Sequence, residues 1–197
     1  MKKGFICGLL VMTILFISGC ENSKNELTTE NIKKLELTGN LVTYQAYYHN
    51  VIEYDKPVGV GITHLLEKER KLFAEYTGTI RLGINLSKVK IEMKKNSINV
   101  FIPKTKIIGE PNVNKDDFDA NNFIESKDSW INSNPITADD SASAFDKAQK
   151  EMKEVAMNDE ELLSQAQQRA KILIEEKIIQ LSGLNRKGLN IMWEYEQ

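Results

Sequence analysis

The sequence has few of the residues that build covalent and metal-bound sites. Its 197 residues include only two cysteines, Cys7 and Cys20, and two histidines, His49 and His64. Zinc sites and disulfide frameworks need cysteine or histidine side chains at short, defined spacings, and neither histidine has such a neighbour in the sequence. We therefore predict no cofactor, no zinc site and structural roles for both histidines.

Familiar catalytic signatures and an excess of one charge are absent too. The sequence has no G-x-S-x-G or H-E-x-x-H motif and no phosphate-binding or dinucleotide-binding glycine loop. Its 26 basic and 28 acidic side chains give a formal net charge of −2, without the basic stripe that nucleic-acid binding requires. These absences favour a non-catalytic role and argue against a nucleic-acid partner.

The apolar run at the N-terminus is too short to cross a bilayer as a helix. It extends from Gly4 to Ile17 after Lys2 and Lys3, whereas a transmembrane helix needs about 20 apolar residues. A basic start, an apolar core of about 7–15 residues and small residues at the end are typical of a secretory signal peptide. We therefore predict that residues 1–19 direct export and are removed.

The segment Ser18-Gly19-Cys20, which ends this run, resembles the bacterial lipobox, with Ile17 where leucine is more usual. In a lipobox the chain is cut before the cysteine, here between Gly19 and Cys20, and the cysteine sulfur receives a diacylglycerol. The resemblance implies a lipoprotein held by lipid on Cys20, with acyl chains such as palmitate, at the extracytoplasmic face of the cell membrane. The alternative is an ordinary signal peptide that happens to end in cysteine.

The remaining chain divides into a tether and one domain. Residues 20–31, which begin with the lipidated cysteine, are polar and have no periodic apolar face, as is typical of a flexible tether. Residues 32–197 suit a single domain with a sizeable core. Removal of residues 1–19 takes away Lys2 and Lys3 and no acid, which leaves 178 residues with 24 basic and 28 acidic side chains and a net charge of −4.

An alternating apolar pattern between residues 76 and 102 predicts the centre of the fold, because apolar side chains at every second position are typical of a half-buried strand. After the first such strand, the pattern restarts on both sides of Lys95-Asn96, which predicts an antiparallel hairpin. The β-branched and aromatic residues of segment 41–54 predict one strand or a pair of strands before it, and Ile107-Ile108 predicts a short one after it. The first strand has the apolar face Tyr76, Ile80, Leu82 and Ile84.

From residue 140 onward the periodicity becomes that of helices. Asp139, Asp140 or Ser141 can cap the first helix, Asn158-Asp159 divides it from a second one, and Gly183 is a natural stop. The predicted fold class is α+β, an antiparallel β-sheet packed against C-terminal α-helices, with a final C-terminal strand. The side chains that define these elements are Ala144, Ala148, Met152 and Val155; Leu162, Leu163, Ala166, Ala170, Leu173, Ile174, Ile178 and Leu181; and Leu189, Ile191, Trp193 and Tyr195.

Four of these features follow one another in a recognisable order. They are Leu41-Val42-Thr43, the run from Tyr76 to Gly83-Ile84-Asn85-Leu86-Ser87, the strand ending in Ile102-Pro103, and the alanine-rich helix ending in Gly183 before the last strand. Together they resemble the bacterial domain-of-unknown-function 4230 family over residues 35–195. That family more often has Asp where this chain has Asn85, which argues against an essential carboxylate there. The resemblance implies no assigned activity.

The loop of residues 109–138 holds the best candidate for a metal site. Its oxygen-bearing side chains occupy positions one, three, five, nine and twelve of a twelve-residue stretch, as in an EF-hand calcium loop. Against calcium, the loop lacks the usual glycine, a shorter aspartate replaces the final glutamate, and neither flank has a helical pattern. We predict a solvated acidic loop and no metal, with calcium as the alternative on Asp117, Asp119, Asn121, Glu125 and Asp128.

Three functions remain open. The first is a membrane-anchored, non-catalytic module for binding, scaffolding or an envelope-associated role, with a possible protein partner. The second is an enzyme or small-ligand binder with its site in the 109–138 loop and the sheet edge. The third is a membrane-surface protein that self-associates through the alanine-rich helix 144–181. A concave pocket with convergent buried polar groups favours the second, whereas Tyr44, Tyr47, Tyr48 and Tyr54 are predicted to pack on a strand and not to line a groove.

Overall fold

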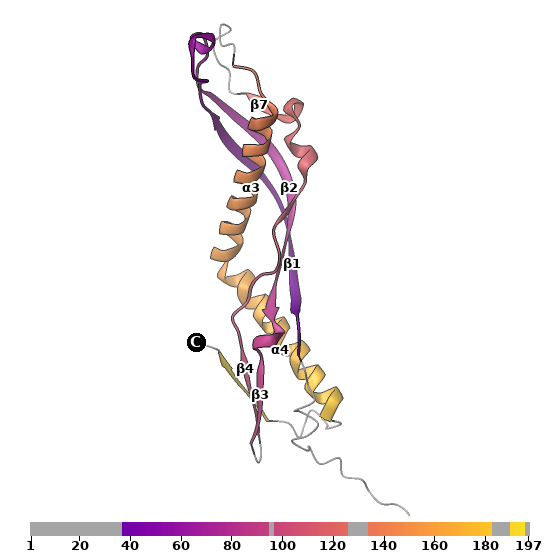
Figure 1. Cartoon of the computed structure of the whole chain (residues 1–197). Coiled ribbons are helices and arrows are strands. Elements are labelled where there is room, and N and C mark those ends of the chain that lie inside the picture. Colours follow the sequence, from indigo (N-terminus) through magenta and orange to yellow (C-terminus); the bar gives the residue numbers. More distant parts are fainter. Residues whose placement is uncertain (1–36, 95–96, 126–133, 183–189, 196–197) are drawn as a thin grey trace, which may run out of the picture.

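A long antiparallel hairpin organises an elongated molecule (Figure 1). The computed structural model describes residues 37–94, 97–125, 134–182 and 190–195. Strand β1 (Asn40–Lys56) pairs with β2 (Arg70–Asn85) along its whole length, and β1 is one continuous strand. The four side chains predicted to share one face of β2 are all buried, so the predicted strand and its orientation are confirmed.

A β-bulge near the open end of the hairpin explains why residue 83 is glycine. The pairing register shifts between Val42 and Tyr44, which leaves Thr43 as the extra residue of a bulge. The Thr43 hydroxyl donates a hydrogen bond of 2.8 Å to the carbonyl oxygen of Ala166. Opposite the bulge, a Cβ on Gly83 would lie only 1.9 Å from the carbonyl oxygen of Leu41. The bulge therefore requires glycine at residue 83.

The neighbouring Asn85 caps the 3₁₀ helix η2 (Leu86–Lys88). Its side-chain oxygen accepts a hydrogen bond of 2.9 Å from the backbone N–H of Ser87. An aspartate carboxylate offers the same acceptor. Asparagine therefore provides this cap without a charge.

The segment after residue 103 runs beside β2 and pairs with it at three places. Strands β5 (Lys106–Ile107), β6 (Asn112–Val113) and β7 (Ile124–Glu125) each pair antiparallel with β2 and complete a five-stranded sheet. Between β6 and β7 lie the 3₁₀ helices η3 (Lys115–Phe118) and η4 (Ala120–Asn122). The 109–138 loop is thus partly ordered on the sheet. Phe118 and Phe123 anchor it in the core.

A second sheet has three strands, β3 (Lys90–Lys94), β4 (Ser97–Ile102) and β8 (Ile191–Tyr195). The predicted hairpin is confirmed because β3 and β4 pair antiparallel, with Lys94 opposite Ser97. Strand β8 adds to β4 in the parallel sense, which the antiparallel prediction did not include. Parallel neighbours need a crossover connection. Here the chain between β4 and β8 contains both long helices.

The helices α3 (Ala138–Asn158) and α4 (Glu160–Ser182) meet at Asp159, as the sequence predicts. The cap of α3 differs from the prediction. Thr137 is the capping residue, and Asp140 completes a capping box from inside the first turn. At the junction the Asp159 carboxylate accepts the backbone N–H of Leu162 at 2.9 Å.

Two of the predicted core positions on the helices are wrong. Val155 is 51% exposed, and Ala156 takes the buried position because the face that contacts the sheet repeats every four residues from Ala144. Leu181 is exposed near the end of α4. None of the helices among the described residues combines the length and hydropathy needed to cross a membrane.

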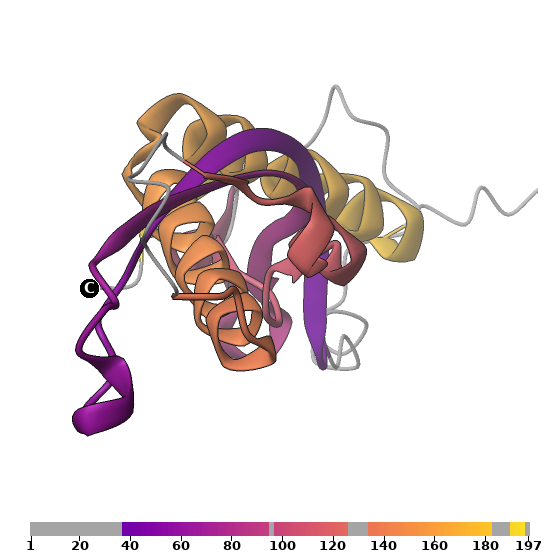
Figure 2. The same cartoon turned by 90° about the horizontal axis from the view of Figure 1, so that it is seen from above.

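The helices lie along the hairpin and the small sheet and bury two apolar clusters. The hairpin curves around α3 (Figure 2), and the alanine face of this helix packs against it in the first cluster. In the second cluster α4 packs against the three-stranded sheet through Ala170, Ile174 and Ile178. Small alanine side chains let a helix approach a sheet closely. These contacts support the observed α+β architecture.

Candidate functional site

The loop that joins β1 and β2, residues 57–69, carries a group of exposed large apolar side chains, and we call it the tip. It projects beyond the helices at one end of the molecule (Figures 1 and 2). Its large aliphatic side chains point into solvent instead of into a core. They are Val60, Ile62, Leu65 and Leu66, which are 97, 87, 78 and 67% exposed, together with Val58 at 38%.

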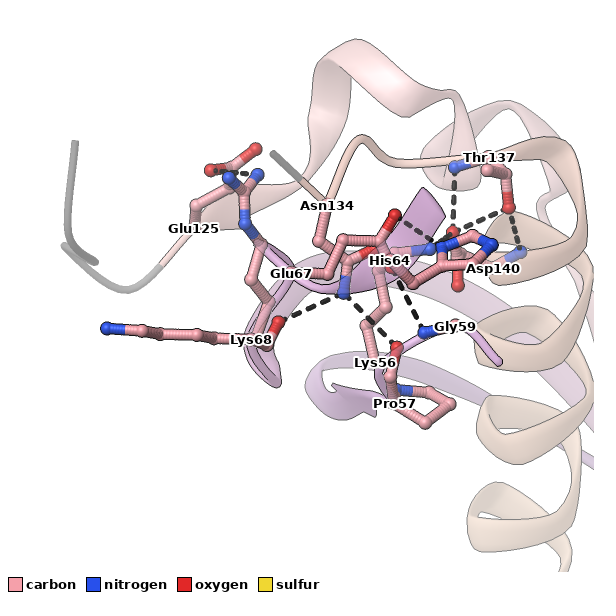
Figure 3. A network of polar contacts seen from close by, with 11 residues as sticks. Lys56, Pro57, Gly59, His64, Glu67, Lys68, Glu125, Asn134, Thr137 and Asp140 are labelled. Carbon is pink, nitrogen blue, oxygen red and sulfur yellow. Dashed lines mark hydrogen bonds and ion pairs between the residues drawn. The ribbon is translucent and has the colours of Figure 1, made fainter. Parts of the chain in front are cut away.

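The tip is held in shape by its own polar groups (Figure 3). One Glu67 carboxylate oxygen accepts the backbone N–H of Gly59 at 3.0 Å, and the other lies 2.7 Å from Nδ1 of His64. These two contacts, the hydrogen bond first, hold the pKa of Glu67 below its usual value. A Cβ on Gly59 would lie 2.1 Å from the His64 ring, so only glycine permits this close approach.

A buried amide joins the two arms of the tip where they leave the sheet. The side chain of Asn134, 2% exposed, donates hydrogen bonds of 3.2 and 3.0 Å to the carbonyl oxygens of Pro57 and Lys68. Next to it, the Arg70 guanidinium donates to the Glu125 carboxylate at 2.9 Å. The base of the tip is therefore fixed to the segment that precedes α3 and to β7.

A buried ion pair connects the end of β1 to the start of α3. Lys56 Nζ lies 2.5 Å from Asp140 Oδ2, and both residues are less than a tenth exposed. The same carboxylate accepts hydrogen bonds from the backbone N–H and the hydroxyl of Thr137 at 2.7 and 2.6 Å. Burial raises the pKa of Asp140, but the hydrogen bonds from Lys56 and Thr137 outweigh burial and hold that pKa below its usual value.

Sequence reasoning missed both the tip and its ion pair. Lys56 and Asp140 are 84 positions apart, and no pattern near either residue predicts their contact. For the tip, the sequence does contain a signal. Five aliphatic residues stand in a segment that Pro57, Gly59 and Gly61 mark as a loop, and apolar residues in a turn have no core to enter.

A cleft of about 770 Å³ lies farther along the hairpin and is lined by residues of β1, β2, β6 and α3. Tyr47, 79% exposed, and the half-buried Tyr48 both line it, while Tyr44, Tyr48 and Tyr54 pack against the first apolar cluster, as predicted. Most of its polar lining is exposed and already hydrogen-bonded within the chain. Gln149, for example, donates to the carbonyl oxygen of Pro111 at 3.0 Å.

The two histidines pair with carboxylates. Nε2 of His49 lies 2.6 Å from Oε1 of Glu75, on the opposite strand of the hairpin, where both side chains are about two-thirds exposed. His64 belongs to the internal contacts of the tip. Each histidine thus has a carboxylate partner within the chain, and the structural role of both histidines stays a prediction.

The candidate calcium ligands point to other partners. Asp117 accepts hydrogen bonds from the backbone N–H and hydroxyl of Thr77 at 2.8 and 2.9 Å, and Asp119 accepts the backbone N–H of Asn121 at 3.0 Å. Glu125 binds Arg70, and Asp128 lies outside the described residues. Within the described part of the chain, no three acidic, histidine or cysteine side chains converge on a point that would suit a metal ion.

Calcium should therefore leave the stability of the protein unchanged. We expect the thermal unfolding midpoint to be the same in excess chelator and in millimolar calcium, because the carboxylates already have donors and a ligand that binds only the folded state would raise the midpoint. Differential scanning calorimetry of the chain from Glu21 onward measures this. A calcium-dependent rise that Asp119→Asn abolishes would contradict it.

The geometry defines a class of protein: an elongated α+β domain with a five-stranded and a three-stranded sheet, two consecutive helices and a projecting apolar tip. The chain belongs to the family described as "Protein of unknown function (DUF4230)", whose model matches residues 33–186. The match includes the tip and both long helices but not β8. Neither a search of curated proteins nor a search of solved structures gave a match.

Proposed function

We propose that this protein is an exported, membrane-anchored lipoprotein that acts as a non-catalytic binding module through its tip. The observation that carries the proposal is the tip itself, four highly exposed aliphatic side chains on a loop fixed by buried polar contacts. Exposed apolar groups of this kind mark interaction sites in soluble domains. A loop already held in one conformation binds with little further ordering cost.

The position of the proposed anchor supports this role. Cys20 precedes the first described residue, Leu37, which lies next to the open end of the hairpin, whereas the tip lies at the closed end. Strand β1 has 17 residues, which at about 3.3 Å each separates the two ends by about 55 Å. Lipid on Cys20 and the tip would therefore act at opposite ends of the hairpin.

The other two functions receive less support. The cleft that would serve a small ligand or an enzyme contains exposed polar groups that the chain itself largely satisfies, whereas ligand sites usually enclose converging polar groups. Self-association through the alanine-rich helices would need an exposed alanine face. The alanines of this face, Ala144, Ala148, Ala156, Ala166 and Ala170, are fully buried within the chain.

Replacement of the candidate lipid-bearing residue tests the anchor. We expect Cys20→Ser to abolish metabolic labelling by a fatty-acid analogue and to prevent cleavage after Gly19, because the substitution removes the sulfur that would carry the lipid. The measurement is labelling of the immunoprecipitated protein, together with its size on a denaturing gel. Ser18→Ala, which keeps a small residue, is the matched control. A Cys20→Ser protein that is processed and labelled like the wild type would overturn the anchor.

A further inference from the structure

We propose that the tip inserts its aliphatic side chains into the acyl-chain region of a phospholipid bilayer, the one that holds the anchor. This inference rests on the proposed function, because it names the partner of the same loop. Four aliphatic side chains, Val60, Ile62, Leu65 and Leu66, supply the inserting surface. All four lie within residues 60–66 of a projecting loop (Figure 2).

The chemistry of the tip fits lipid better than protein. Residues 57–69 contain no arginine, tyrosine, tryptophan or phenylalanine, and these residue types dominate the binding energy of protein interfaces. The tip is also a single loop, a smaller contact area than the roughly 800 Å² that a specific protein interface normally buries on each partner. Insertion among acyl chains requires only apolar surface, and this loop has apolar side chains at its outermost point.

Several polar groups of the tip have partners within the loop, so shallow insertion would leave few of them without a hydrogen-bond partner. The Glu67 carboxylate is already paired with Gly59 N–H and with His64. The backbone N–H groups of His64 and Glu67 donate to carbonyl oxygens of the same loop at 3.1 and 3.0 Å. Unsatisfied backbone groups are costly in lipid, so this internal pairing favours entry of the loop.

Charge does not drive the contact. Lys56, the nearest cation on β1, is buried against Asp140, and the neighbours Lys68 and Glu69 carry opposite charges. Binding through basic residues to anionic lipid would need a cationic cluster. Insertion of the tip should therefore depend weakly on salt and on the anionic lipid content.

The tip can reach the bilayer that holds the anchor. Residues 20–39 span up to about 70 Å when fully extended at about 3.5 Å per residue, which exceeds the length of about 55 Å for strand β1. A lipid on Cys20 would add to the affinity that the loop itself has for lipid.

Vesicle flotation tests the insertion without the anchor. The protein is the chain from Glu21 onward, the predicted mature form without its lipid-bearing residue, with neutral phosphatidylcholine vesicles in excess. We expect the wild type to float, and the triple variant Val60→Ser, Ile62→Ser, Leu65→Ser to lose at least about tenfold in partition, because each buried aliphatic side chain contributes strongly to transfer. All three side chains are highly exposed, so the substitutions should leave the fold intact, as circular dichroism can verify.

A control variant replaces the same number of exposed apolar side chains elsewhere. Val51→Ser, Val155→Ser and Met192→Ser replace three exposed side chains outside the tip and should leave partition unchanged. Partition should also be the same at about 0.1 and about 0.5 M salt, where exposed charges are screened to different extents.

Three outcomes overturn the inference: no flotation of the wild type, equal loss in both triple variants, or a concentration-dependent dimer without vesicles that the tip variant abolishes. The last outcome would assign the tip to a second copy of the chain. Cys20 is absent from the protein in this test, so its failure leaves the anchor untouched, and failure of the lipid-labelling experiment on Cys20→Ser leaves the tip untouched.

Discussion

Asp140→Ala is expected to lower the free energy of unfolding by about 3–5 kcal/mol, because it leaves the ammonium group of Lys56 buried without its partner. Lys56 is 7% exposed and lies 2.5 Å from the carboxylate that the substitution removes. The same carboxylate accepts two hydrogen bonds from Thr137 at the start of α3. The substitution therefore disrupts the base of the tip and the helix cap together.

Urea denaturation of the chain from Glu21 onward, followed by circular dichroism, measures this loss. Asp139→Ala is the matched control, since Asp139 is the neighbouring, exposed residue of the same helical turn. It should change stability by no more than about 0.5 kcal/mol. Equal effects of the two substitutions would contradict the assigned role of the ion pair.

The ion pair also predicts how acid affects stability. The pKa of Asp140 is lower in the folded protein than its ordinary value of 3.8, so the folded state favours the ionised form. Its contribution is fully present above the ordinary pKa and is lost as the pH falls through the lower folded pKa. Below about pH 4 the wild type should therefore lose stability more steeply than Asp140→Asn. Parallel acid limbs in the two proteins would contradict the assignment.

Gly83→Ala is expected to destabilise the protein by about 2–3 kcal/mol, the upper range for overpacking. The added Cβ would lie 1.9 Å from the carbonyl oxygen and 2.8 Å from the carbonyl carbon of Leu41, and 3.0 Å from Cα of Val42. All three atoms belong to the backbone of β1, so no side chain can rotate to relieve the clash. The bulge at Thr43 would have to shift.

Gly78→Ala on the same strand is the matched control. There the nearest atoms, at 3.1 Å, are the flexible end of the Met152 side chain and one backbone oxygen. We expect this change to cost less than about 1 kcal/mol, measured by the same urea titration. If Gly83→Ala is as stable as Gly78→Ala, the bulge is not the reason for glycine at residue 83.

Local patterns in the sequence predicted most of the secondary structure. Alternation placed Tyr76, Ile80, Leu82 and Ile84 on one buried face, and Asn158-Asp159 marked the break between the helices. These predictions succeed because hydrophobic periodicity and helix ends depend on residues close in the chain. The family resemblance was equally local, and two residues of the run that carries it, Gly83 and Asn85, are explained by the bulge and by the cap of η2.

Long-range pairing could not be predicted in the same way. The parallel addition of β8 to β4 and the contact of Lys56 with Asp140 depend on how distant segments cross. The exposed tip was missed for a different reason. Its apolar side chains are exposed, although large apolar side chains are usually buried. Only the fold shows that they lie outside both apolar clusters. Sequence patterns predict single helices and strands. The candidate site is formed by the loop between two strands and by its contacts with distant segments.

The most direct measurement is the depth of the tip in a bilayer. The chain from Glu21 onward has no cysteine, so Ile62→Cys offers one thiol for an environment-sensitive dye. On addition of neutral vesicles we expect its emission to shift to the blue and to be quenched by lipids brominated on their acyl chains, whereas a dye at Tyr47→Cys, also on the exposed surface of the hairpin, should not respond. Unchanged emission at residue 62, or equal quenching at both positions, would contradict insertion of the tip.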